Sequence, residues 1–169
     1  ILRGLVGSEM CIRDSNLAGA TSQGTNSVAV GRQAGQNTQG NSSVALGYSA
    51  GIGTQGNYAV ALGSGAAYSG QGENAIAIGY DSGLNNQGAS SIAIGYNAGW
   101  SMHANSIVIN ATGGATGVNS AAASSFVVKP IRSATGSSML MYDSTTGEIT
   151  YGTGAVSYTH LTLPTNVAV

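Results

Sequence analysis

The chain has 169 residues, a formal net charge of -1 and only 7% charged residues, whereas about a quarter is usual in soluble domains. A net charge this close to zero creates no field that would attract nucleic acid or an anionic membrane, and no apolar run reaches the roughly 18 residues of a membrane-spanning helix. We therefore expect neither a nucleic-acid partner nor direct insertion of this chain into a membrane.

The two ends of the chain are complementary to each other at the level of a coding sequence. Residues 10–14 read MCIRD and residues 156–160 read VSYTH. One permitted coding of VSYTH is GTC TCT TAT ACA CAT, and its reverse complement, ATG TGT ATA AGA GAC, codes for MCIRD. The pair resembles the mosaic end of transposase-based sequencing libraries. We interpret residues 1–15 and 156–169 as translated adaptor, which sets aside Cys11 and His160 and makes the remainder a fragment.

A repeat of sixteen residues fills residues 16–110. Its constant part is an aliphatic residue, an alanine, a second aliphatic residue and a glycine. The aliphatic positions are Val28, Val30, Val44, Leu46, Val60, Leu62, Ile76, Ile78, Ile92 and Ile94; the alanines are Ala29, Ala45, Ala61, Ala77 and Ala93; the glycines are Gly31, Gly47, Gly63, Gly79 and Gly95. Fixed self-similarity with a period too short for a helix pair predicts an all-β chain, a parallel β-roll or β-solenoid with one repeat in each coil.

Each constant part is predicted to be a short strand that ends at the glycine, where the coil turns. Side chains alternate across a strand, so the aliphatic residues share one face and the alanines share the other. We assign the aliphatic ladder to the core. A strand that is apolar on both faces is usually covered on both, so the small, flat alanine ladder is predicted to line a subunit interface, with an uncovered alanine ribbon as the alternative. A weaker second strand is predicted near residues 34–37, with a turn at Gln39-Gly40.

The repeat weakens after the fifth copy. Residues 105–110 form a degenerate unit, residues 111–125 are rich in Gly, Ala and Ser and predict a linker, and residues 126–155 predict a separate small β element. In that element residues 138–142 and 148–151 flank a hairpin loop, 143–147, that closes on glycine.

The sequence contains no arrangement of residues that catalysis or metal binding would require. Outside the two ends His103 is the only histidine, and no two acids occupy equivalent repeat positions. We expect a non-enzymatic protein without metal or cofactor. Tyr48, Tyr80 and Tyr96 share one repeat position and predict an outer aromatic face, which either binds a ligand or receptor or shields the ladder by stacking.

The repeat pattern can be compared with two further classes of protein, ice-binding solenoids and adhesins. An ice-binding solenoid needs a regular threonine array, and the candidate column is interrupted: Ser22, Thr38, Thr54, Gly70 and Asn86. The segments NSVAVGRQAG, NAIAIGYDSG and SSIAIGYNAG, in contrast, resemble the head repeats of YadA-like trimeric autotransporter adhesins. That resemblance implies a left-handed β-roll, a homotrimer and an extracellular head on an outer-membrane adhesin.

The segment 124–154 resembles a part of phage and large-virus fibre proteins that precedes a C-terminal chaperone domain. That resemblance implies a virion fibre instead of a bacterial adhesin. Both resemblances imply the same kind of function, which is attachment of a trimeric surface fibre to a host cell through a cell-surface receptor, a matrix protein or a glycan.

Overall fold

The computed structural model describes residues 12–13, 15–113, 117–131 and 139–152. The segment 156–169 interpreted as adaptor, and most of residues 1–15, lie outside the described residues. Within the described ranges the secondary structure consists of β-strands and turns, without a helix. The chain divides into two units, one extending to Ile131 and the other beginning at Arg132.

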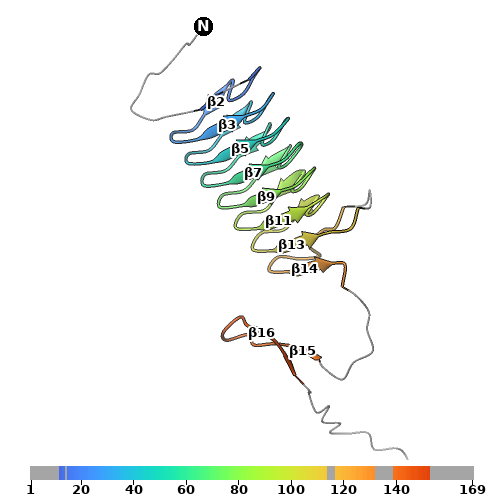
Figure 1. Cartoon of the computed structure of the whole chain (residues 1–169). Helices are drawn as coiled ribbons and strands as arrows, with labels where there is room; N and C mark the ends of the chain where they lie inside the picture. Colours follow the sequence, from blue (N-terminus) through green and yellow to red (C-terminus); the bar gives the residue numbers. More distant parts are fainter. Residues whose placement is uncertain (1–11, 14, 114–116, 132–138, 153–169) are drawn as a thin grey trace, which may run out of the picture. The chain divides into compact units, whose positions relative to one another are not determined.

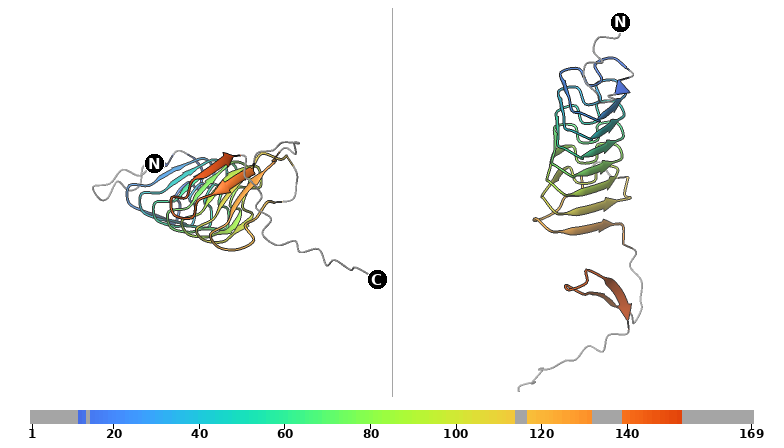
Figure 2. Two further views of the ribbon diagram at one scale, coloured as in Figure 1. Left: turned by 90° about the horizontal axis from the view of Figure 1, so that it is seen from below. Right: turned by 90° about the vertical axis from the view of Figure 1, so that its left-hand side faces the viewer.

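The first unit is a parallel β-solenoid, as the repeat predicts (Figure 1). One side of the stack is an eight-stranded sheet, and all its neighbouring strands pair in parallel (Figure 2). Its strands are β1 (Ile12–Arg13), β3 (Val28–Val30), β5 (Val44–Leu46), β7 (Val60–Leu62), β9 (Ile76–Ile78), β11 (Ile92–Gly95), β13 (Ile107–Asn110) and β14 (Phe126–Lys129).

The other side is a six-stranded sheet of β2 (Ser22–Gln23), β4 (Thr38–Gln39), β6 (Thr54–Gln55), β8 (Gly70–Gln71), β10 (Asn85–Gln87) and β12 (Ser101–Met102). The register follows the repeat, because Val28 pairs with Val44, Val44 with Val60 and Val60 with Ile76. The left-handed sense of the coil, which came from the family resemblance, stays a prediction.

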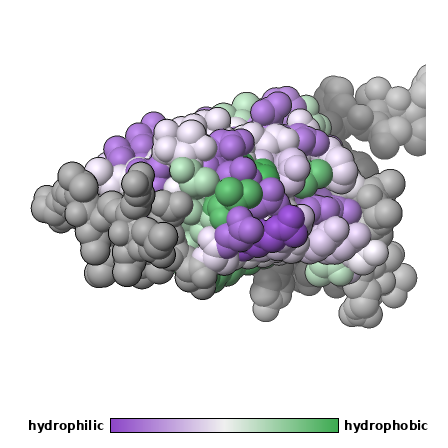
Figure 3. Space-filling model, turned by 90° about the horizontal axis from the view of Figure 1, so that it is seen from above, coloured by the Kyte–Doolittle hydropathy of each residue, from purple (hydrophilic) through white to green (hydrophobic). Residues whose placement is uncertain are grey.

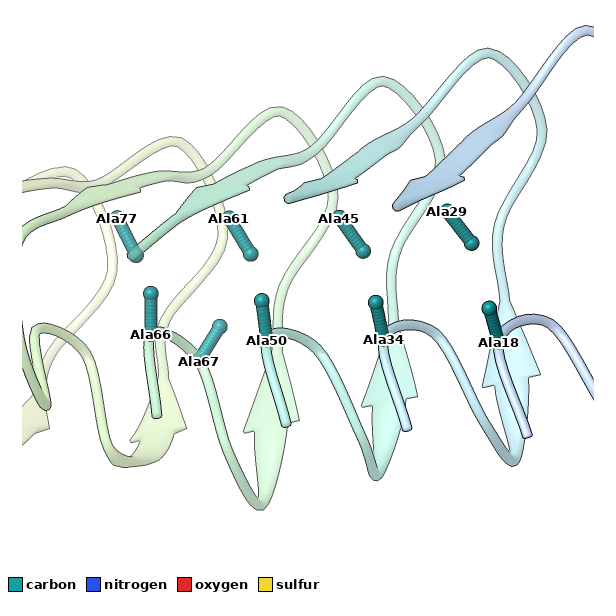
Figure 4. Packing of buried hydrophobic residues seen from close by; sticks show 9 residues of the cluster. All are labelled: Ala18, Ala29, Ala34, Ala45, Ala50, Ala61, Ala66, Ala67 and Ala77. Atoms are coloured by element: carbon teal, nitrogen blue, oxygen red, sulfur yellow. The ribbon is translucent and has the colours of Figure 1, made fainter. Parts of the chain in front are cut away.

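From the first coils to β9 the hydrophobic core between the two sides is made of alanine, and in the last coils Met102, Val108 and Val118 join it. Ala29, Ala45, Ala61 and Ala77 point from the eight-stranded sheet toward a second alanine column on the facing side of each coil, Ala18, Ala34, Ala50 and Ala66 (Figure 4). Every one of these side chains is completely buried. Because the two walls are separated by little more than two methyl groups, the coil is thin and has no room for larger side chains at these positions.

This arrangement reverses the predicted assignment of the two strand faces. The alanines of the constant part, Ala29, Ala45, Ala61, Ala77 and Ala93, have no exposed surface and are therefore not available to contact another chain. The aliphatic residues assigned to the core lie on the outer face of the sheet and are partly exposed, with 39% exposure at Leu46 and 38% at Leu62. The physical reason is size, since from β3 to β11 the small alanine side chains fill the narrow space between the two walls.

The second strand of each coil also differs from the prediction. It lies at Thr38–Gln39 instead of residues 34–37, so the glutamine of the Gln-Gly pair belongs to a strand and the glycine follows it. The glutamine side chain is buried, and its amide nitrogen donates to the backbone carbonyl of the opposite strand, Gln39 to Val28 over 2.7 Å and Gln71 to Val60 over 2.8 Å. These bonds tie the two sheets together across the coil.

The same glutamines form a ladder between coils. The amide nitrogen of Gln55 donates to Oε1 of Gln71 over 3.1 Å, and that of Gln71 donates to Oε1 of Gln87 over 3.2 Å. Stacked amide ladders of this kind are known from cross-β structures, where identical side chains repeat at the strand spacing. The glutamine position therefore adds hydrogen bonds both across a coil and between coils.

The corners of each coil are residues with positive φ. The turn glycines after the first strand have φ between 109° at Gly95 and 134° at Gly47. A second corner, just before that strand, has φ between 52° and 58° and is filled by non-glycine residues, of which Tyr58 is the bulkiest. Asn and Asp tolerate this conformation better than other non-glycine residues, and bulky residues are rare in it.

We expect Tyr58→Asn to raise the free energy of unfolding by about 0.5–1 kcal/mol, because it relieves the left-handed backbone conformation without removing a buried contact. Tyr58 is 59% exposed, and Asn26 and Asn74 occupy the same corner in other coils. The measurement is urea unfolding followed by circular dichroism. Tyr68→Asn is the matched control, since Tyr68 is also exposed but does not have a positive φ. Equal effects of both substitutions would contradict the explanation.

The end of the solenoid departs from the sixteen-residue period. β13 follows β11 after fifteen residues, because Ile92 pairs with Ile107, and β14 follows β13 after nineteen, because Ile107 pairs with Phe126. The segment beginning at Phe126, predicted as part of a separate element, thus starts with the last strand of the eight-stranded sheet. Within the predicted linker Val118 bridges to Ala98 and is almost fully buried.

The second unit is a hairpin of β15 (Met139–Tyr142) and β16 (Ile149–Gly152), which pair in antiparallel fashion as predicted. Oδ1 of Asp143 accepts the backbone N–H of Thr145 over 2.7 Å and that of Thr146 over 3.2 Å. These hydrogen bonds to the ionised form lower the pKa of Asp143. The turn closes at Gly147, whose φ of 75° suits glycine.

Candidate interaction surface

The outer side of the eight-stranded sheet carries two columns of large apolar side chains along its whole described length. We call these residues the aliphatic face: Val28, Val30, Val44, Leu46, Val60, Leu62, Ile76, Ile78, Ile92, Ile94, Ile107, Ile109, Phe126 and Val128. The side chain of each is half-buried or exposed. Isolated exposed apolar residues are normal, but a continuous strip of them marks a surface that binds another molecule.

The end of the stack drawn in Figure 3 presents mostly hydrophilic or neutral residues, with hydrophobic residues in limited patches. The six-stranded sheet presents Ser22, Thr38 and Thr54 in register, and the column is interrupted at Gly70. That interruption leaves no regular threonine array of the kind an ice-binding surface requires.

A column of tyrosines accompanies the aliphatic face, one residue after the turn glycines. The rings of Tyr80 and Tyr96 are stacked, with centroids 5.4 Å apart and planes inclined by 10°. In the first coil of the column Arg32 takes the tyrosine position, and its guanidinium carbon lies 5.5 Å from the centroid of the Tyr48 ring. Tyr48 and Tyr80 are each 51% exposed. The predicted outer aromatic face therefore combines stacking with an accessible surface.

Asp81 is the acidic residue of this region and follows directly after Tyr80. Partial burial raises the pKa of Asp81 above its ordinary value of 3.8, while a hydrogen bond with the Tyr80 side chain acts in the opposite direction. The charge of Asp81 in turn raises the pKa of Tyr80. Asp81 was not among the site residues predicted from the sequence. Two features could have pointed to it, because acids are rare in the repeats and this one lies beside the tyrosine column.

We expect the stability of the protein to depend on the titration of Asp81. A carboxyl whose pKa is raised by folding binds its proton more tightly in the folded state, so this contribution to stability falls as pH rises from 3.8 through the folded pKa and is constant above it. Asp81→Asn should remove this dependence and be at least as stable as the parent at pH 7, because Asn97 occupies the same corner in the next coil. Urea midpoints between pH 3.5 and 7 test this, and parallel pH profiles for the two proteins would contradict it.

The structure brings no catalytic or metal-binding group together within the described residues. No cluster of three or more potential metal ligands occurs there. Nδ1 of His103 lies 3.2 Å from both the carbonyl oxygen and the hydroxyl of Ser120. Among the described residues no helix is long and apolar enough to cross a membrane.

The comparisons with known proteins agree with the coil geometry. The family model of the YadA head domain repeat matches the chain in two copies, over residues 18–34, 71–82 and 87–98. These three segments of the chain are similar to YadA head domain repeats. No curated protein and no solved structure gives a significant match.

YadA head repeats belong to structural, adhesin-type fibres on the outside of cells and not to an enzyme family, and YadA head domains in general form homotrimers. The matched residues include the strand that carries Ala29, the strand that carries Ala93 and the glutamines Gln71 and Gln87. The match therefore includes members of the buried alanine column, the glutamine ladder and the turn glycines.

Proposed function

We propose that this chain is a non-enzymatic head segment of a homotrimeric, extracellular surface fibre that attaches to a host cell or its surroundings. The observation that carries the proposal is the aliphatic face, a strip of large apolar side chains left uncovered by a coil whose own core is alanine. A protein that functioned as a single chain would carry polar residues on that face.

The chemistry of the aliphatic face suits contact with copies of itself. It contains neither a charged residue nor a hydrogen-bonding side chain, so packing against another apolar face leaves no buried polar group unpaired. Burying the exposed part of one such side chain is worth on the order of 1 kcal/mol, and the strip repeats this gain in every coil. The number of copies, three, follows from the behaviour of YadA head domains.

Attachment is the function that a rigid, repetitive head supports. The YadA head repeats favour a bacterial autotransporter adhesin over a phage or virus fibre, which would share the trimeric architecture. The partner on the host side is a cell-surface receptor, a matrix protein or a glycan, and the surface available to it in the proposed trimer is the part of each coil away from the aliphatic face.

The experiment is an attachment assay with beads that carry the whole chain, offered to cultured host cells and to panels of matrix proteins and glycans. We expect attachment above that of albumin-coated beads, and loss of it with Leu62→Asp, which places a charge in the aliphatic face. Attachment that is the same for coated and albumin beads across all targets would contradict the adhesive function.

A further inference from the structure

One coil lacks the large side chain that the coils on either side carry in the tyrosine column. The residue at this position is Tyr48 in the preceding coil, Ser64 in this coil and Tyr80 in the following coil. Ser64 is followed by Gly65. The three coils are in contact here, because the Gly65 N–H donates to the Tyr48 carbonyl over 2.9 Å and the Asp81 N–H to the Ser64 carbonyl over 3.0 Å. We call the gap between the two tyrosines the Ser64 notch.

A carboxylate lies at this notch. A Cβ placed on Gly65 would overlap Oδ1 of Asp81, so the Asp81 side chain leans from its own coil over the glycine of the coil before. Within residues 15–113 Arg32 is the only arginine or lysine, and it lies beside Tyr48, three coils before Tyr80. The coils therefore supply no second cation for this carboxylate.

The column itself shows which groups fit beside a tyrosine at the spacing of one coil. On one side of the notch the Arg32 guanidinium occupies the coil next to Tyr48, 5.5 Å from the ring centroid. On the other side the Tyr96 ring occupies the coil next to Tyr80, at 5.4 Å. Both are flat groups, and the Tyr96 ring is nearly parallel to the Tyr80 ring. The notch is the coil between Tyr48 and Tyr80 in which Ser64 replaces such a group.

We propose that the Ser64 notch binds the guanidinium group of an arginine side chain from a partner protein, stacked between Tyr48 and Tyr80 and paired with the Asp81 carboxylate. A cation within about 6 Å of a tyrosine ring is attracted by the π face, and here two faces are offered at once. The guanidinium is preferred over the ammonium of lysine because it is planar, stacks on rings and pairs with a carboxylate through two parallel hydrogen bonds.

This inference is independent of the proposed trimer, because the notch uses no side chain of the aliphatic face. It is tested on the whole chain in the oligomeric state in which it purifies, by nuclear magnetic resonance of the backbone amides. The probe is N-acetyl-arginine amide, and its uncharged counterpart is N-acetyl-citrulline amide. We expect saturable shifts centred on Ser64, Gly65 and Asp81 with the arginine probe, and at least about tenfold weaker binding of the citrulline probe.

Two substitutions locate the site. Ser64→Tyr continues the tyrosine column, fills the notch and should abolish binding. Asp81→Asn removes the charge at a position where Asn97 occurs in the next coil, and should weaken binding at least about tenfold. Thr54→Ala, on the six-stranded sheet, is the control and should bind as the parent does. Circular dichroism and mass are checked for each variant, and Asp81→Asn carries the test alone if Ser64→Tyr does not fold.

Several results would overturn the proposal. They are the absence of saturable shifts, equal binding of the arginine and citrulline probes, and unchanged binding by Asp81→Asn. A panel of monosaccharides is titrated in parallel, because tyrosine rings also stack on sugars. Saturable shifts at the notch with a sugar and none with the arginine probe would assign the notch to a glycan and would likewise overturn it.

Discussion

Gly63→Ala is expected to lower the free energy of unfolding by about 3 kcal/mol, one of the largest effects of any single methyl group added to this chain. Two costs combine at this position. The φ of Gly63 is 127°, which an L side chain rarely adopts, and the added Cβ would lie 2.6 Å from the carbonyl oxygen of Gly79 in the next coil. That oxygen belongs to backbone and cannot rotate away.

The neighbouring coil cannot move aside, because hydrogen bonds fix the spacing between coils on both sides of Gly63. The Gly63 N–H donates to the Leu46 carbonyl and the Gly79 N–H to the Leu62 carbonyl, each over 2.8 Å. Urea unfolding measures the effect. Gly113→Ala is the control, since a Cβ there would meet no atom within 4 Å. If Gly63→Ala proves as stable as Gly113→Ala, the coil-to-coil contact is not as close as described.

Ala61→Asp is expected to unfold the solenoid, at a cost of at least about 3 kcal/mol, because it places a carboxylate in the alanine core. Ala61 has no exposed surface, and the core cluster around it consists of alanines without a cation. The matched substitution is its neighbour, Leu62→Asp, which lies on the aliphatic face and is 38% exposed.

These two variants distinguish the inside of the coil from its outside. Leu62→Asp should keep the β-rich circular dichroism spectrum and lose self-association, whereas Ala61→Asp should lose the spectrum itself. The opposite pattern, with Ala61→Asp folded but dissociated and Leu62→Asp unaffected, would restore the assignment of the alanines to a subunit interface.

The period, the strand positions of the constant part and the coil register could be predicted from the sequence. A strand pattern repeated every sixteen residues leaves few alternatives to stacked parallel coils, and the observed pairing of Val44 with Val60 follows directly from it. The turn between β15 and β16 could also be predicted from the sequence, because its loop begins at Asp143 and closes on Gly147.

Which face of each strand points into the coil could not be predicted in the same way. Alternation separates two faces, but when both faces are apolar it does not say which one is inside. The deciding quantity is the distance between the two walls of the coil, which depends on the facing residues Ala34 and Ala50 and on the buried Gln55. Recognising that a second alanine recurs at a fixed distance from the first would have indicated a thin core.

A ladder of stacked glutamines was expected from the repeat, but the hydrogen bonds that these glutamines make across the coil, and the Ser64 notch, were not predicted, for related reasons. A Gln-Gly pair resembles turn chemistry, and the hydrogen bond from Gln55 to the Val44 carbonyl spans eleven residues, so it is visible only once the coil is closed. The notch is defined by what one coil lacks, Ser64 in place of tyrosine, and its carboxylate comes from Asp81 in the coil that follows.

Light scattering of the whole chain and of Leu62→Asp measures directly whether copies of the chain cover the aliphatic face. We expect three times the chain mass of 16.6 kDa for the parent and the mass of a single, folded chain for the variant. A parent chain that is stably folded as a monomer would show that the aliphatic face is not covered by copies of itself, and would contradict the proposed fibre.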